Sequence, residues 1–188
     1  MARWEPNGRD RLEQAALALY VERGFEKTTV AEIAERAGLT ERTFFRHFAD
    51  KREVLFSGSA LLHELLAERI AAAPTDAVPI EAVGVALEAA GALIQERGDW
   101  SRQRQSVITA NPELQERELI KLASLASAAT DALRRRGVKD PAARLAAEAG
   151  MAAFKVAFER WVHQPTKRNL PRLIRQSLDQ LRAVTAST

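Results

Sequence analysis

Apolar residues recur at helical spacing along the chain, and no stretch alternates between apolar and polar residues for more than a few positions. Ala, Leu, Glu and Arg, which favour helices, dominate the composition, whereas β-branched residues are scattered. Gly and Pro fall at intervals that divide the chain into segments of helical length. The pattern therefore predicts an all-α fold.

The predicted helices follow from apolar faces, capping residues and breaks. They cover residues 8–23, 30–37, a short helix after Thr40, 51–73, 80–97, 101–110, 112–136, 141–164 and 169–184. The helix over 51–73 is expected to begin under a cap from Asp50 and to be much longer than the three before it. We expect it to join an N-terminal domain, residues 1–55, to a larger helical domain, residues 56–188.

Residues 38–51, GLTERTFFRHFADK, have the pattern of a turn followed by a recognition helix. Gly38 allows a sharp change of direction, and Phe44 and Phe48, four positions apart, face inward together. The outward positions are then Glu41, Arg42, Phe45 and Arg46, flanked by Thr40, Thr43 and His47. An outward phenylalanine can pack on a thymine methyl group, and arginine can donate two hydrogen bonds to guanine. The segment therefore predicts a helix-turn-helix that reads the major groove of DNA.

Overall charge gives little support to this reading. The chain has a net charge of +3, and residues 1–60 carry ten basic and ten acidic residues. Any DNA-facing charge must therefore come from the arrangement of the side chains. The chain has no cysteine, which excludes disulfides and cysteine-ligated metals. It also has no apolar run long enough for a membrane span and no signal peptide. We expect a cytosolic protein without metal or cofactor.

The motif TTVAEIAERAGLTERTFFRHFADKREVL, residues 28–55, resembles the DNA-binding signature of the TetR/AcrR family of bacterial transcription regulators. With the preceding ALALYVERGFEKT, the similarity covers about the first 55 residues. The resemblance implies a ligand-responsive regulator, most often a repressor, that binds a palindromic operator in double-stranded DNA as a homodimer. The family usually has tyrosine at Phe45, where the hydroxyl contacts a DNA phosphate, so this chain departs from the pattern there.

The resemblance also implies individual roles. Phosphate contacts are expected from Thr29, Thr40, His47 and Lys51, and base contacts from Arg42, Thr43 and Arg46. Lys51 would lie at the start of the fourth helix, where backbone amides and an ammonium group together attract an anion. Arg3, ahead of the first helix, would either reach a neighbouring groove or belong to a disordered basic arm.

The C-terminal part is predicted from its own pattern. The run LAAEAGMAAFKVAF, residues 145–158, is apolar nearly all round and carries a stripe of small residues, and the last helix has a regular leucine face. Two such helices predict a four-helix dimer interface. Its expected residues are Ala146, Gly150, Ala153, Ala157, Leu173, Ile174, Leu178 and Leu181.

A small-molecule effector site is expected where large aromatic residues and polar groups converge. The candidate residues are Trp100, Arg104, Phe154, Phe158 and Trp161.

Two other functions remain open at this point. An enzyme is disfavoured because the three histidines lie on different predicted helices and no metal, phosphate-binding or nucleophile motif is present. A helical protein-interaction module that keeps an unused helix-turn-helix would be distinguished by its failure to bind a palindromic duplex.

Overall fold

The computed structural model describes residues 7–163 and 169–186, and every regular element within them is helical. The elements are α1 (Gly8–Arg23), α2 (Val30–Arg36), α3 (Glu41–His47), the 3₁₀ helix η1 (Glu53–Phe56), α4 (Ser59–Ala72), α5 (Pro79–Glu96), α6 (Gly98–Thr109), α7 (Pro112–Arg135), α8 (Ala142–His163) and α9 (Leu170–Ala186). The all-α prediction is confirmed, and most helix boundaries agree with it to within a few residues. Arg3 and most of the break predicted at 164–169 lie outside the described residues.

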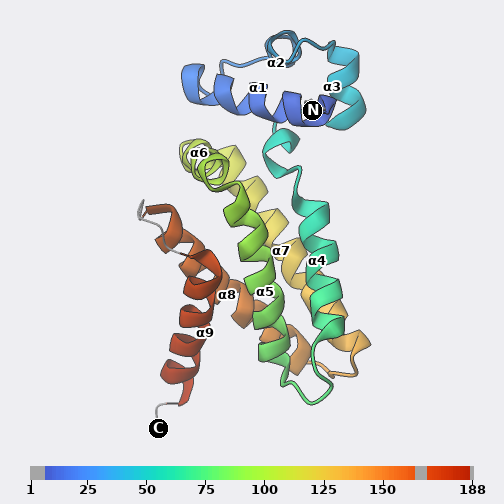
Figure 1. Ribbon diagram of the computed structural model, residues 1–188, viewed down its shortest axis with the longest axis vertical. Helices are drawn as coiled ribbons and strands as arrows, with labels where there is room; N and C mark the ends of the chain where they lie inside the picture. The colour runs from blue at the N-terminus through green and yellow to red at the C-terminus, as the bar shows by residue number, and fades with distance from the viewer. Residues whose placement is uncertain (1–6, 164–168, 187–188) are drawn as a thin grey trace, which may run out of the picture. The chain divides into compact units, whose positions relative to one another are not determined.

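The chain divides into two compact units, coloured by chain position in Figure 1. Unit 1 contains residues 1–57 and 99–118, and unit 2 contains residues 58–98 and 119–188. This grouping differs from the sequence-based division at residue 55. The reason is that Ile108 of α6 and Leu114 of α7 are fully buried in the same core as Leu12 of α1 and Phe44 of α3.

The fourth helix does not begin where the sequence pattern placed it. Asp50 does act as a cap, because its Oδ1 accepts the N–H groups of Arg52 at 2.8 Å and Glu53 at 3.1 Å. The capped segment is η1, however, and its residues 54–56 are all buried in unit 1. A separate helix, α4, starts at Ser59 after Gly58 and has 14 residues.

In unit 2, α5 is the central helix and contacts α4, α8 and α9 (Figure 1). Gly150 of α8 allows the close approach of α8 to α5. A Cβ atom added there would lie 3.2 Å from Leu87 Cδ1 and closer than 3.0 Å to Val83 Cγ1. Gly91 of α5 similarly faces α9, because its added Cβ would lie 2.6 Å from Ile174 Cδ1. Both glycines therefore allow tight helix packing within the chain.

The residues predicted to form the dimer interface belong instead to the core of unit 2. Seven of them are buried within the single chain, and Leu181 is half-buried; the buried ones are Ala146, Gly150, Ala153, Ala157, Leu173, Ile174 and Leu178. Side chains that are already covered by neighbouring helices leave almost no surface for a second copy. The small-residue stripe thus marks helix packing inside the subunit, which corrects the interface assignment.

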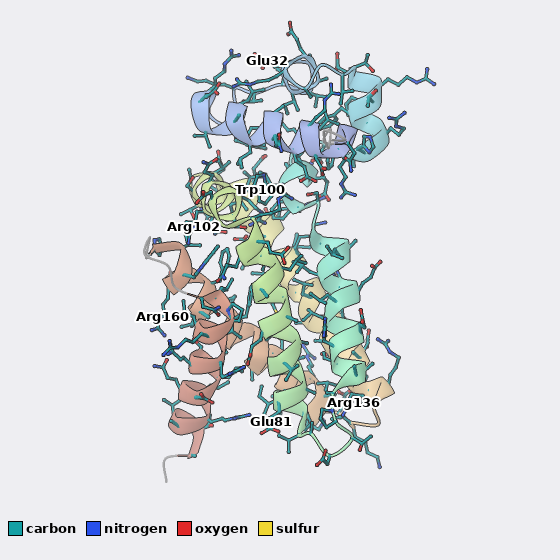
Figure 2. All side chains as sticks on the ribbon, viewed as in Figure 1. Glu32, Glu81, Trp100, Arg102, Arg136 and Arg160 are labelled. Carbon is teal, nitrogen blue, oxygen red and sulfur yellow. The ribbon has the colours of Figure 1, made fainter. Side chains whose placement is uncertain are left out.

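Arginine side chains join the helices of unit 2 at their ends. Arg136, just after α7, donates to the carbonyls of Ile70 at 3.0 Å and Ala73 at 2.7 Å, so it caps the C-terminus of α4 (Figure 2). Arg182 of α9 pairs with Glu81 of α5 at 3.2 Å.

None of the helices in the described ranges combines the length and apolar character that a membrane crossing requires.

Candidate DNA-binding surface

The helix-turn-helix is built by two capped helices and one turn. The Thr29 side chain accepts the Glu32 N–H at 3.2 Å, and the Glu32 carboxylate accepts the Thr29 N–H at 2.8 Å, so a capping box starts α2. Gly38, with a φ of 64°, makes the turn after α2 in a conformation that other residues rarely adopt. Thr40 then caps α3 by accepting the Thr43 N–H at 3.2 Å. In Figure 1, α2 is seen nearly end-on and α3 from the side.

Arg11 of α1 holds this turn from outside. Its Nε donates to the Ala37 carbonyl at 2.9 Å, and its Nη2 donates to the Gly38 carbonyl at 3.1 Å. Turn carbonyls outside a helix need such donors. The sequence reasoning missed this role, because a contact between residues 26 positions apart leaves no periodic signal in the sequence.

The two faces of α3 are those that the sequence predicted. Phe44 is fully buried and Phe48 nearly so, and their ring centroids are 5.5 Å apart. Phe45 points outward with 56% of its surface exposed, although its ring lies edge-on to Phe44 at 5.4 Å. Arg42 and Arg46 are also exposed on this face. The outward face of α3 therefore combines an aromatic ring with two guanidinium groups.

Most basic side chains near α3 are already bonded within the protein. Arg23 pairs with Glu32 at 3.0 Å, Arg36 with Glu22 at 2.6 Å and Arg52 with Asp50 at 2.6 Å. The hydrogen bond from Arg36 lowers the pKa of Glu22, and that from Arg52 lowers the pKa of Asp50. Within each pair, the acidic side chain neutralises the charge of the basic one.

Three cations differ from the rest. Among the described residues of segment 7–60, Lys27, Arg42 and Arg46 are the basic side chains without a hydrogen bond or ion pair to another described residue. Two of the three lie on α3. Arg42 and Arg46 therefore give α3 two cations that are not paired within the described protein, next to one carboxylate, Glu41, at the start of the helix.

The residues predicted to contact phosphates differ in their exposure and in their place on the helices. Thr29 and Thr40 are exposed, and both act as helix caps. The hydroxyl oxygens of Thr40 and Thr43 lie 3.1 Å apart, which orients both at the start of α3. His47 is half-buried at the end of α3 beside Phe48.

The structural premise for Lys51 is wrong. Lys51 does not begin an α-helix, and the nearby amides of Arg52 and Glu53 are taken by the Asp50 carboxylate. Its Nζ instead donates to the carbonyls of Phe25 at 2.9 Å and Thr28 at 3.0 Å. The expected anion site at this position is therefore absent.

Comparisons with known proteins agree with this geometry. Residues 13–57 match the model described as bacterial regulatory proteins of the tetR family, and residues 78–186 match that of the MftR C-terminal domain. The second match covers more than half of the chain. The chain belongs to the TetR family of transcription regulators. TetR-family regulators are not enzymes, which confirms the prediction that this chain is not one.

Individual relatives cover different shares of this TetR-family chain. The HTH-type transcriptional regulator TcmR of Streptomyces glaucescens is 38% identical over 81 residues, which is 43% of this chain and 36% of TcmR. The chain thus aligns with about a third of that relative. A complex of SmeT, a repressor from Stenotrophomonas maltophilia, with triclosan has 20% identity and a TM-score of 0.68, covering 95% of this chain and 91% of SmeT.

A second structural neighbour is FadR of Bacillus subtilis in complex with stearoyl-CoA. It is 20% identical, with a TM-score of 0.65, and the match covers 92% of this chain and 96% of FadR. At this identity both structural matches show a shared fold.

The predicted effector residues are divided between the two units. Trp100 and Arg104 lie in unit 1, whereas Phe154, Phe158 and Trp161 lie in unit 2. Arg104 donates to the Leu55 carbonyl at 2.5 Å and pairs with Glu118 at 3.0 Å, and burial lowers its pKa. The buried guanidinium of Arg104 is therefore already bonded to groups of unit 1, and these bonds explain its burial without a ligand.

The three aromatic residues of α8 do form a row. The rings of Phe154 and Phe158 are 5.9 Å apart and nearly parallel, and those of Phe158 and Trp161 are 5.8 Å apart. Phe154 and Trp161 are buried, and Phe158 is half-buried. The row supplies one wall of the apolar interior of unit 2.

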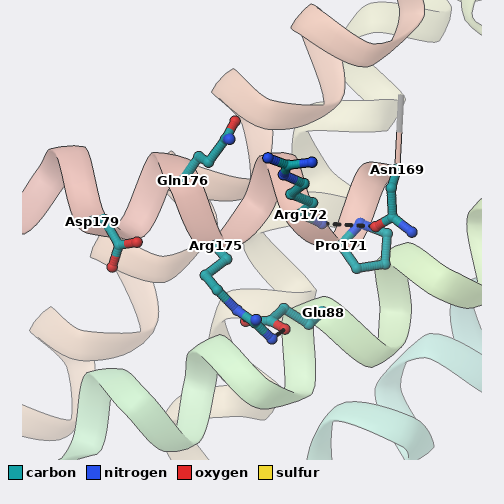
Figure 3. A pocket seen from close by; sticks show the side chains of 7 residues that line it. All are labelled: Glu88, Asn169, Pro171, Arg172, Arg175, Gln176 and Asp179. Atoms are coloured by element: carbon teal, nitrogen blue, oxygen red, sulfur yellow. Dashed lines mark hydrogen bonds and ion pairs between the residues drawn. The ribbon is translucent and has the colours of Figure 1, made fainter. Parts of the chain in front are cut away.

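A surface groove of about 520 Å³ lies along α5 and the first turns of α9 (Figure 3). Arg175 bridges it by donating to Glu88 at 3.0 Å, and Arg172 and Asp179 also line it. None of the predicted effector residues contributes to it. Ligand pockets are mainly apolar, so this charged groove is a poor candidate for the effector site.

Proposed function

We propose that this TetR-family regulator is a repressor that binds a palindromic operator as a homodimer and is released by a small molecule. The observation that carries the proposal is the outward face of α3. It exposes Phe45 and leaves Arg42 and Arg46 without partners among the described residues, while the other two phenylalanines of the motif are buried. Guanidinium groups on an exposed helix face offer the paired donors that read guanine in the major groove, and Phe45 is exposed between them.

Base reading is assigned to Arg42, Thr43 and Arg46, because guanidinium groups offer paired donors to guanine in the major groove. Phe45 would lie at the edge of the groove beside the phosphate that the tyrosine usual in the family contacts. Thr29, Thr40 and His47 surround this face and would contact phosphates, which fixes the register of the helix on the duplex.

The homodimer is proposed to form through the outer face of α8. Leu145 is 65% exposed and Val156 is 49% exposed, and Ala149 and Ala152 lie between them at spacings of four, three and four residues. This spacing places all four on one side of the helix, which gives an apolar stripe facing away from the core of unit 2. A second copy that covered the stripe would remove it from water and hold two recognition helices together.

The effector is proposed to bind in unit 2 beside the aromatic row of Phe154, Phe158 and Trp161. The related structures of SmeT and FadR contain triclosan and stearoyl-CoA, and both ligands include a large apolar part. An apolar wall of stacked rings suits a ligand of that kind.

Selection of bound duplexes from a random pool tests the proposal. We expect recovery of one inverted-repeat motif whose half-sites are about one helical turn apart. Recovery of no motif, together with salt-sensitive binding to all duplexes alike, would contradict sequence-specific regulation. Absence of any binding would favour the protein-interaction module.

A further inference from the structure

Lys51 lies in the turn between α3 and η1, and its side chain reaches back across the unit. The ammonium group donates to three carbonyls of the loop between α1 and α2: Phe25 at 2.9 Å, Thr28 at 3.0 Å and Glu26 at 3.4 Å. It also lies 4.3 Å from the centroid of the Phe25 ring. An ammonium group has three donors, so these carbonyls use all of them.

The backbone of Lys51 is held as well. The buried hydroxyl of Tyr20 donates to the Lys51 carbonyl at 2.6 Å. Burial raises the pKa of Tyr20, so the hydroxyl keeps its proton and remains a donor at neutral pH. The side chain of Lys51 is therefore bonded to the loop after α1, and its backbone carbonyl is bonded to Tyr20 of α1.

The loop that Lys51 holds leads directly into Thr29, the N-cap of α2. Lys51 itself follows the end of α3 by four residues. Its contacts thus connect the segment that enters the helix-turn-helix with the segment that leaves it. Together with Arg11, which holds the central turn, Lys51 fixes the path of the backbone around both short helices.

We propose that Lys51 is a positioning residue for DNA recognition and not a phosphate ligand. It holds the start of α2 in place relative to α3, and DNA affinity depends on that placement. The proposal rests on the proposed DNA-binding function. A phosphate contact would require the ammonium group to leave three carbonyls and an aromatic face, whereas Lys27 in the same loop is exposed with no such bonds among the described residues.

The test measures operator affinity against salt concentration for Lys51→Met, Lys51→Arg and the matched control Lys27→Met. A lost phosphate contact makes the slope of log K against log salt shallower by about 0.9. For Lys51→Met we expect about tenfold weaker binding with an unchanged slope. Lys51→Arg should weaken binding similarly, because a planar guanidinium cannot direct three donors at the same carbonyls.

A shallower slope for Lys51→Met, or normal affinity for Lys51→Arg, would overturn the proposal, since either result indicates a phosphate contact. Normal affinity and slope for Lys51→Met would overturn it too.

Amide exchange provides a second measurement without DNA. The Ile33 amide, which donates to the Thr29 carbonyl at 3.1 Å, should exchange faster in both Lys51 variants than in Lys27→Met. If the wild-type protein bound no duplex, the proposed function would fail, and equal exchange in all variants would separately refute the positioning role.

Discussion

Replacement of Gly150 by alanine tests whether α8 packs against α5 inside the subunit. The new Cβ would lie closer than 3.0 Å to Val83 Cγ1, whereas carbon atoms in contact normally stay about 3.5–4.0 Å apart. Val83 is fully buried and β-branched, so it has little rotamer freedom with which to move away. Overpacking of this kind costs about 1–3 kcal/mol.

Alanine also favours the helix over glycine by about 0.8–1.0 kcal/mol, which offsets part of that cost. The net loss for Gly150→Ala is then about 0–2 kcal/mol. Lys155→Gly, compared with Lys155→Ala at the same exposed position of α8 outside the proposed dimer stripe, provides the matched control because it removes the helix preference without touching α5. It should lose about 1 kcal/mol. The sum of the two losses isolates the packing cost.

Urea unfolding followed by circular dichroism, at one fixed protein concentration, measures both losses. We expect the sum to be about 1–3 kcal/mol. A sum near zero, with Gly150→Ala shifting the protein from dimer to monomer in sedimentation, would show that Gly150 faces a second copy after all. It would restore the interface that the sequence predicted.

Two further substitutions test the proposed surfaces. Phe45→Tyr would supply the hydroxyl usual in the family, and one added phosphate hydrogen bond should tighten operator binding a few-fold, or about 1 kcal/mol; unchanged or weaker binding in a titration would place Phe45 on a base edge. Val156→Glu would put like charges of two subunits into one apolar stripe, so we expect a monomer in sedimentation that keeps its helical circular dichroism; a stable dimer would remove the outer face of α8 from the interface.

The DNA-binding surface could be predicted from sequence because its signals are local. The caps at Thr29 and Thr40, the turn at Gly38 and the i, i+4 spacing of Phe44 and Phe48 each act within a few residues. Burial of Phe44 and exposure of Phe45 follow from helical geometry, whereas Phe48 is buried from the extended residue that ends α3.

The sequence was less informative about the partner of Gly150, the start of the fourth helix and the role of Lys51, which depend on contacts between distant segments. A stripe of small residues looks the same whether it meets a helix of its own subunit or of another, so Gly150 was assigned to the wrong partner. The apolar residues of η1 were assigned to the start of the long fourth helix, because a short 3₁₀ helix followed by Gly58 and a separate α-helix has no distinct apolar pattern. Lys51 was placed at a helix start because its bonds to a loop 23 to 26 residues away have no sequence signature.

The central claim is that α3 reads sequence, and Arg46→Ala tests it most directly. The measurement is the ratio of affinities for the selected palindrome and for a random duplex, with Arg36→Ala as control because Arg36 is exposed but paired with Glu22. We expect Arg46→Ala to lose about 1–3 kcal/mol of binding free energy on the palindrome and much less on the random duplex, so that the ratio falls. Arg36→Ala should leave the ratio unchanged. Equal losses on both duplexes for Arg46→Ala would contradict the account, because they would make Arg46 a contact to the phosphate backbone alone.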